Sequence, residues 1–227
     1  MKGVKFWFTS IVWIACATNC FSQESTLKKA ELSAHNKTAD LAKTGKPALL
    51  TLSQLLERYA GTASIKEKAD VCYDLSRWYT ARLKIDSSLY FAEKIRAYSE
   101  KVNYTLGIGK YHLARASALY YRLSSRQEAM EQSTKALNIF IAQKDDQFTG
   151  VSYRQLAMLY DSDNLSGKAL AKAAFWQSIH YLKKADDNQS LERSYYLLGR
   201  LYLHASAFDS AADYSIKALQ LAEVLGD

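Results

Sequence analysis

Apolar residues recur at steps of three and four over most of the chain, which is the spacing of one face of an α-helix. Two runs near the end show it most clearly: Tyr195, Leu198 and Tyr202, then Ala211, Tyr214, Ala218 and Leu221. The segment Ala205-Ser206-Ala207-Phe208-Asp209 makes a short break between the runs, and Asp209 is placed to cap the second helix. The two runs therefore predict a helical hairpin.

This pattern returns along the chain with a period of about 41 residues. At an offset of 123, three periods, segment 73–79 matches 196–202 at two tyrosines, a leucine and an arginine. At an offset of 82, Lys135-Ala136-Leu137 matches Lys217-Ala218-Leu219. The third unit fits after a slip of two residues in the turn-forming segment 161–167. Four hairpins are predicted, at about 65–103, 104–145, 146–187 and 188–227.

The last hairpin resembles the tetratricopeptide repeat. That family has Leu-Gly and Tyr on its first helix, and Ala, an aromatic residue and Ala-Leu on its second. The corresponding residues are Leu198-Gly199, Tyr202, Phe208, Ala211, Tyr214 and Ala218-Leu219. The match is weaker in the middle hairpins, and the period exceeds the usual repeat of about 34 residues. The resemblance implies an all-α, right-handed solenoid of about four hairpins.

The hairpin needs small residues where its two helices cross. At an interaxial distance of about 8–10 Å, one helix must lack bulk where the other contributes a large side chain. We expect Gly199, Ala211 and Ala218 to be the small partners, and Tyr202 and Tyr214 the large ones.

The first 47 residues lie outside the repeats. Residues 1–22 combine a positive start, an apolar stretch of about 12 residues and a small-residue end, which is typical of a cleaved secretory signal peptide. Lipidation at Cys16 or Cys20, or an uncleaved membrane anchor, are the alternatives. Residues 23–47 are polar and predict a flexible lead.

The two ends of the repeat array differ. Residues 48–64 carry leucines and Tyr59 at near-helical spacing, which predicts a helix that caps the first hairpin. The last helix has an apolar face around Leu219 and Leu221 that has no such cap. This face indicates self-association, coverage by a partner, or a sequence that is part of a longer protein.

Charge and cysteine content narrow the function. The 30 Lys and Arg exceed the 23 Asp and Glu by seven, but the charges are interspersed, which argues against nucleic acid as a partner. Removal of the signal segment leaves Cys72 as the only cysteine, so a disulfide within one chain is excluded. We expect Cys72 to pack as a small apolar residue, with a reactive thiol as the alternative.

No motif for catalysis, metal or cofactor is present. The four histidines are far apart, no CxxC occurs, and no Gly-x-Ser-x-Gly is found. Gly107-Ile-Gly109-Lys110 resembles a phosphate loop, but it lacks a third glycine and is followed by Tyr111, so it is interpreted as the start of a helix. The chain is predicted not to be an enzyme, and a site assembled across the groove remains the alternative.

A solenoid of this family presents a concave surface lined by the first helix of each hairpin. Eight residues of types that bind well at interfaces are predicted to project there: Tyr73, Arg77, Tyr111, Tyr121, Arg122, Arg154, Tyr196 and Arg200. Packing in the helix stack and ion pairs within it are the alternatives. The Lys-and-Asn clamp that some members use for C-terminal carboxylates is not carried over, because those positions hold Arg77, Ala118, Met158 and Arg200.

These observations predict an exported, non-catalytic scaffold of the cell envelope, periplasmic or secreted, that binds a protein or an acidic peptide. No transmembrane helix is expected in the mature chain. An alternative function is suggested by the resemblance of the chain to the extracytoplasmic part of Bacteroidetes histidine kinases and helix-turn-helix regulators. In that case the chain would be the extracytoplasmic sensor part, without its membrane and output domains.

Overall fold

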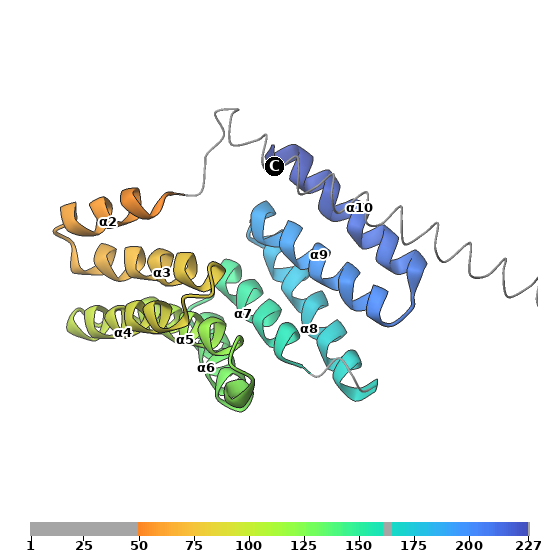
Figure 1. Ribbon diagram of the computed structural model, residues 1–227, viewed down its shortest axis with the longest axis horizontal. Coiled ribbons are helices and arrows are strands. Elements are labelled where there is room, and N and C mark those ends of the chain that lie inside the picture. The colour runs from red at the N-terminus through yellow and green to blue at the C-terminus, as the bar shows by residue number, and fades with distance from the viewer. Residues whose placement is uncertain (1–49, 161–164, 227) are drawn as a thin grey trace, which may run out of the picture. The chain divides into compact units, whose positions relative to one another are not determined.

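The computed structural model describes residues 50–160 and 165–226, and within these ranges the chain is helical, with no strand. The predicted signal segment 1–22 and lead 23–47 lie outside the described residues. Figure 1 shows the helices in chain order. They are α2 (Leu52–Gly61), α3 (Ile65–Ala81), α4 (Ile85–Lys101), α5 (Thr105–Leu119), the 3₁₀ turn η1 (Leu123–Ser125), α6 (Arg126–Ala142), α7 (Asp146–Leu159), α8 (Leu165–Lys184), α9 (Asn188–His204) and α10 (Phe208–Leu225).

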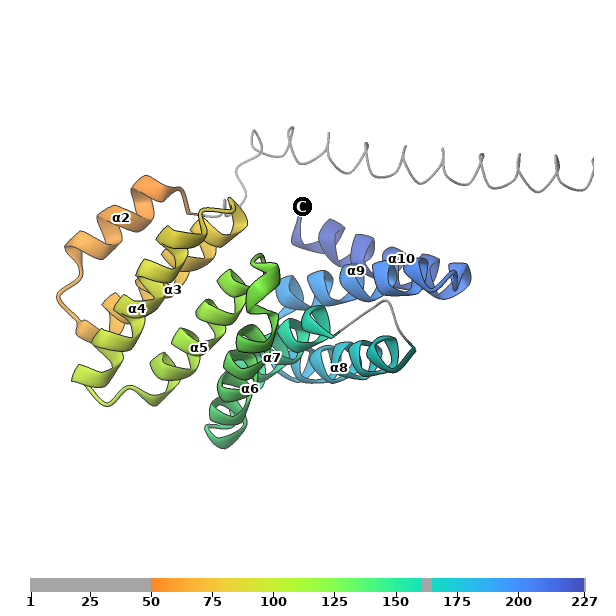
Figure 2. The same ribbon diagram turned by 60° about the horizontal axis from the view of Figure 1, so that its bottom comes forward.

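The helices after α2 pair into four hairpins, α3–α4, α5–α6, α7–α8 and α9–α10, and each hairpin packs on the next (Figures 1 and 2). The first helix of the second hairpin, α5, also contacts the first helices of its two neighbours, α3 and α7. Contacts are thus made within a hairpin and with its neighbours, which is the arrangement of a solenoid. The predicted all-α, tetratricopeptide-like solenoid is confirmed.

The helix α2 covers α3, because Leu55 is buried against Val71 and Leu75. Thr51 and Gln54 form a capping box that starts this helix. The phenol oxygens of Tyr59 on α2 and Tyr98 on α4 lie 2.6 Å apart, so α2 is bound to both helices of the first hairpin.

Five turns between helices share one backbone conformation that the amino-acid types do not reveal. Each contains a non-glycine residue with φ between 51° and 57°: Leu83, Asn103, Lys144, Asp186 and Ser206. The N–H of the following residue donates to a carbonyl five residues back, as in Lys84 to Tyr79 at 2.9 Å. This is the Schellman closure of a helix C-terminus. It recurs with the repeat: position 206 is 123 residues after 83, and 144 is 41 after 103.

The same closure corrects the expected cap of the last helix. Ala207 is the N-cap of α10, no side chain caps it, and Asp209 lies inside the first turn. The turn ends at Ser206, so the helix begins at Phe208, too early for Asp209 to be its cap. A carboxylate in the first turn is still favourable for the helix dipole.

Small residues lie where helices approach each other. A Cβ at Gly199 would be 3.1 Å from Ser215 Oγ and 3.3 Å from the carbonyl oxygen of Ala211. The rings of Tyr202 and Tyr214 stack beside this crossing, 5.5 Å apart. The expected interlock of small and large residues in the last hairpin is confirmed.

The Cys72 thiol is completely buried in the core formed by the first two hairpins. Burial raises its pKa to about 12, although the charge of Lys94 opposes this. At neutral pH the sulfur is therefore a protonated thiol and packs as a small apolar group.

Candidate protein-binding surface

The structure separates the eight residues predicted to line the first helices. Tyr73 and Arg77 on α3 lie close to Arg154 on α7. Tyr111 on α5 packs against α4. The other four residues lie elsewhere: Tyr121 and Arg122 just after the end of α5, and Tyr196 and Arg200 on α9.

Two of the predicted surface tyrosines are core residues. The exposed fractions of Tyr73 and Tyr111 are 6% and 7%. The ring of Tyr73 meets Phe148 of α7 edge-on, with centroids 5.6 Å apart. The ring of Tyr111 packs under Arg96, and its hydroxyl lies 3.4 Å from Glu93. Neither side chain projects from the surface as expected, because side chains of other hairpins close over both rings.

The arginine cluster, defined as Arg77, Arg154 and Arg193, gathers positive charge from three hairpins. Arg154 is half-buried on α7, and its Nη1 donates to the carbonyl oxygen of Ser190 on α9 at 2.9 Å. Burial, together with the charges of Arg193 and Arg77, lowers the pKa of Arg154 to about 10, whereas Tyr73 and Asp187 act in the opposite direction. Among the described residues, no carboxylate forms an ion pair with Arg154.

The aspartates Asp70 and Asp74 on α3 form their ion pairs with cations outside the cluster. Asp70 accepts a bond of 2.7 Å from Nζ of Lys110. Burial raises the pKa of Asp74, against the charges of Arg77 and Arg58, and its carboxylate lies 4.0 Å from Nη1 of Arg58. Among the described residues, the guanidinium of Arg154 is hydrogen-bonded to a backbone carbonyl, and the carboxylate of Asp187 acts on its charge without forming an ion pair.

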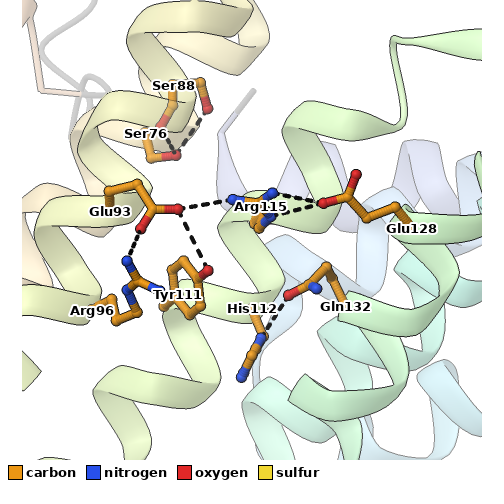
Figure 3. A network of polar contacts seen from close by, with 9 residues as sticks. All are labelled: Ser76, Ser88, Glu93, Arg96, Tyr111, His112, Arg115, Glu128 and Gln132. Atoms are coloured by element: carbon orange, nitrogen blue, oxygen red, sulfur yellow. Dashed lines mark hydrogen bonds and ion pairs between the residues drawn. The ribbon is translucent and has the colours of Figure 1, made fainter. Parts of the chain in front are cut away.

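A second group of polar side chains joins α4, α5 and α6, and its central arginine, unlike Arg154, is paired with carboxylates (Figure 3). Arg115 lies between Glu93 at 2.8 Å and Glu128 at 2.6 Å. On the next turn towards the start of α5, His112 Nδ1 lies 2.7 Å from Oε1 of Gln132. Because its charges are paired, this network holds neighbouring hairpins together and offers no free cation to a ligand.

The other predicted residues are exposed or paired. Arg122 forms an ion pair with Asp86, and Tyr121 beside it is exposed. On α9, Tyr196 is 48% exposed and the guanidinium of Arg200 lies over its ring, 5.8 Å from the centroid.

Sequence reasoning missed Lys110 and Arg193. Lys110 was interpreted as part of a helix start, but it lies within α5 and binds a residue 40 positions earlier. That separation is almost one repeat period, so the repeat itself places both residues on adjacent first helices. Comparison of charged residues one period apart would have found this pair.

The described ranges contain one further hollow and lack the features of a metal site or a membrane span. A shallow hollow of about 340 Å³ lies at the α4–α5 turn, away from the arginine cluster, and is lined by Ser99, Glu100, Asn103, Tyr104, Thr105 and Ile108. No group of three or more His, Cys, Asp or Glu side chains there could hold a metal ion. None of the helices described is both long and apolar enough to span a bilayer.

Comparison with known proteins supports the fold. No protein-family model and no curated protein matches the chain. Aspartyl phosphate phosphatase F from Bacillus subtilis is similar, with a TM-score of 0.59 and 20% identity over 77% of this chain and 45% of that one. The apo form of RapI matches with a TM-score of 0.54 and 19% identity over 75% and 46%, and BtubC from P. vanneervenii with 0.54 and 16% over 77% and 71%. The chain thus spans less than half the length of the first two.

Proposed function

We propose that this protein is a non-catalytic interaction scaffold that binds an acidic peptide segment of a partner protein at the arginine cluster. The observation that carries the proposal is the guanidinium of Arg154, half-buried and without a carboxylate partner among the described residues. A desolvated charge is unfavourable unless it is paired, and the planar fork of Arg matches a carboxylate with two parallel bonds. An incoming Asp or Glu side chain, or a C-terminal carboxylate, supplies that partner.

The location of the cluster favours a peptide over a small anion. Arg77, Arg154 and Arg193 come from α3, α7 and α9, so one ligand has to contact three hairpins. Solenoids use extended surfaces of this kind for binding.

Export to the cell envelope is part of the proposal and is supported by the signal-peptide pattern of residues 1–22. It is tested by fusing residues 1–30 to a reporter enzyme that is active only outside the cytoplasm. The intact leader should give activity, and a leader with Ile11→Asp and Ile14→Asp should not. Equal activity from both fusions would show that this stretch does not direct export.

Binding is tested by fluorescence anisotropy with a labelled peptide that contains four Glu in a Gly/Ser frame, and with the same peptide carrying Gln. We expect saturable binding of the Glu peptide that weakens with salt, and at least tenfold weaker binding of the Gln peptide. Loss of one charge-assisted bond costs about 1.5–3 kcal/mol, and about 1.4 kcal/mol is tenfold in affinity.

The variant Arg154→Gln should lose about tenfold in affinity. Its matched control is Arg82→Gln, because Arg82 is an exposed arginine that stacks on Trp78 at the far end of α3 and is not in the cluster. Circular dichroism checks that both variants are folded. Equal affinity for the Glu and Gln peptides, or equal binding by the two variants, would contradict the proposal.

A further inference from the structure

One face of each hairpin receives the first helix of the next hairpin, and we call it the stacking face. In the first hairpin, four residues of this face meet α5. Glu93 pairs with Arg115, Arg96 lies over the ring of Tyr111, Ser99 lies against Gly107, and Tyr73 packs in the core that α5 completes.

The repeat places an equivalent face on the last hairpin. At the offset of 123 residues, Tyr73, Glu93, Arg96 and Ser99 correspond to Tyr196, Ile216, Leu219 and Ala222. Tyr196, Ile216 and Leu219 are 48%, 52% and 53% exposed, whereas Tyr73 and Ser99 are buried. No described helix covers this part of α9 and α10.

The uncovered face is more apolar than the covered one. Where the first hairpin has Glu93 and Arg96, the last has Ile216 and Leu219. The exposed Phe208 lies on the same side of α10, two turns before Ile216. A helix face that is exposed to water is usually polar, so an apolar one indicates a docking surface.

One positive and one negative side chain lie beside this face, so that two copies of it could pair opposite charges. Arg200 lies on α9 and Asp213 on α10, and neither forms an ion pair among the described residues. Gly199 lies against Ala211 and Ser215, so Arg200 and Asp213 are at the same level along the hairpin. A two-fold axis that runs between α9 and α10, parallel to them, therefore places Arg200 of one copy opposite Asp213 of the other.

We propose that the stacking face of α9 and α10 binds the same face of a second copy of this chain. In this two-fold dimer α9 of one copy lies over α10 of the other, where the first helix of a further hairpin would lie. A helix of 17 residues is about 25 Å long, and two such helices cover about 500 Å² of each copy. The total of about 1,000 Å² reaches the lower limit of a specific interface.

Sedimentation velocity of the chain between about 1 and 100 μM tests the proposal. We expect a dimer that Leu219→Glu converts to a monomer at every concentration. The matched control is Leu170→Glu, because Leu170 is similarly exposed but lies on α8. A wild-type chain that stays monomeric overturns the proposal and leaves as the occupant a helix that is not part of this sequence.

A charge exchange tests the orientation of the two copies. Arg200→Glu should weaken the dimer by placing two acids together, and Arg200→Glu with Asp213→Arg should restore it. A dimer that resists Leu219→Glu, or that the double exchange does not restore, overturns this arrangement. Circular dichroism of each variant separates loss of the dimer from loss of the fold, and peptide binding at Arg154 is a separate readout.

Discussion

The substitution Gly150→Ala tests the packing between α7 and α8. Gly150 is buried in the interior of α7, and a Cβ there would lie 2.6 Å from Cγ of Leu182 and 3.1 Å from its backbone nitrogen. Carbon atoms in contact are ordinarily about 3.5–4.0 Å apart, so the leucine and the backbone of α8 would both have to shift. The leucine has no free space, because it is completely buried against Leu191 and Tyr195.

Two effects of opposite sign decide the outcome. Alanine favours a helix interior over glycine by about 1 kcal/mol, whereas overpacking of a dense core costs about 1–3 kcal/mol. Because part of the obstacle is backbone, we expect the upper part of that range and a net loss of about 1–2 kcal/mol. For a domain of this size the melting temperature should then fall by about 2–8 °C.

Thermal and urea unfolding, followed by circular dichroism, measure this loss. The matched control is Gly61→Ala at the end of α2, where an added Cβ meets nothing within 4 Å, and it should leave stability equal or slightly higher. In a double-mutant cycle, Leu182→Ala should cost less beside Ala at position 150 than beside Gly, because the new methyl group fills part of the cavity. A Gly150→Ala protein as stable as the wild type would refute the close approach of the two helices.

Three further predictions concern a turn, a cap and the cysteine. Leu83→Gly should raise the urea midpoint by the equivalent of about 0.5–1 kcal/mol, because the exposed Leu83 has φ 57°; a lower midpoint would contradict this. Burial alone would raise the pKa of Asp187, but bonds from Ser190 and Gln147 outweigh it and lower that pKa. The ionised Asp187 therefore contributes its full stabilisation above the ordinary carboxyl pKa, and this is lost as the pH falls through the lowered pKa. In Asp187→Asn, the free energy of unfolding should fall less steeply towards acid pH. Chemical unfolding at several pH values measures this. Cys72 should react with a thiol reagent only after urea is added, and fast reaction of the native chain would show an open core.

The repeat could be predicted from sequence because it depends on local spacing. Apolar residues three and four apart define each helix, and Ala211, Ala218 and Gly199 mark where two helices of one hairpin must cross closely. These contacts join residues within a hairpin or one period apart, so they follow from a pattern that recurs at a fixed spacing in the sequence.

Other features depend on contacts between distant hairpins or on backbone geometry. Tyr73 and Tyr111 look like binding residues in sequence, yet side chains of other hairpins close over their rings and make them core. The left-handed turn at Leu83 contains no glycine that would indicate it in the sequence. The hydrogen bonds that close the end of α3 impose the positive φ of Leu83. Sequence alone therefore determined the hairpins and their order. Only the tertiary structure could bring Arg77 and Arg154 together and leave Arg154 without an ion pair among the described residues, because that depends on how α3, α7 and α9 approach one another in space.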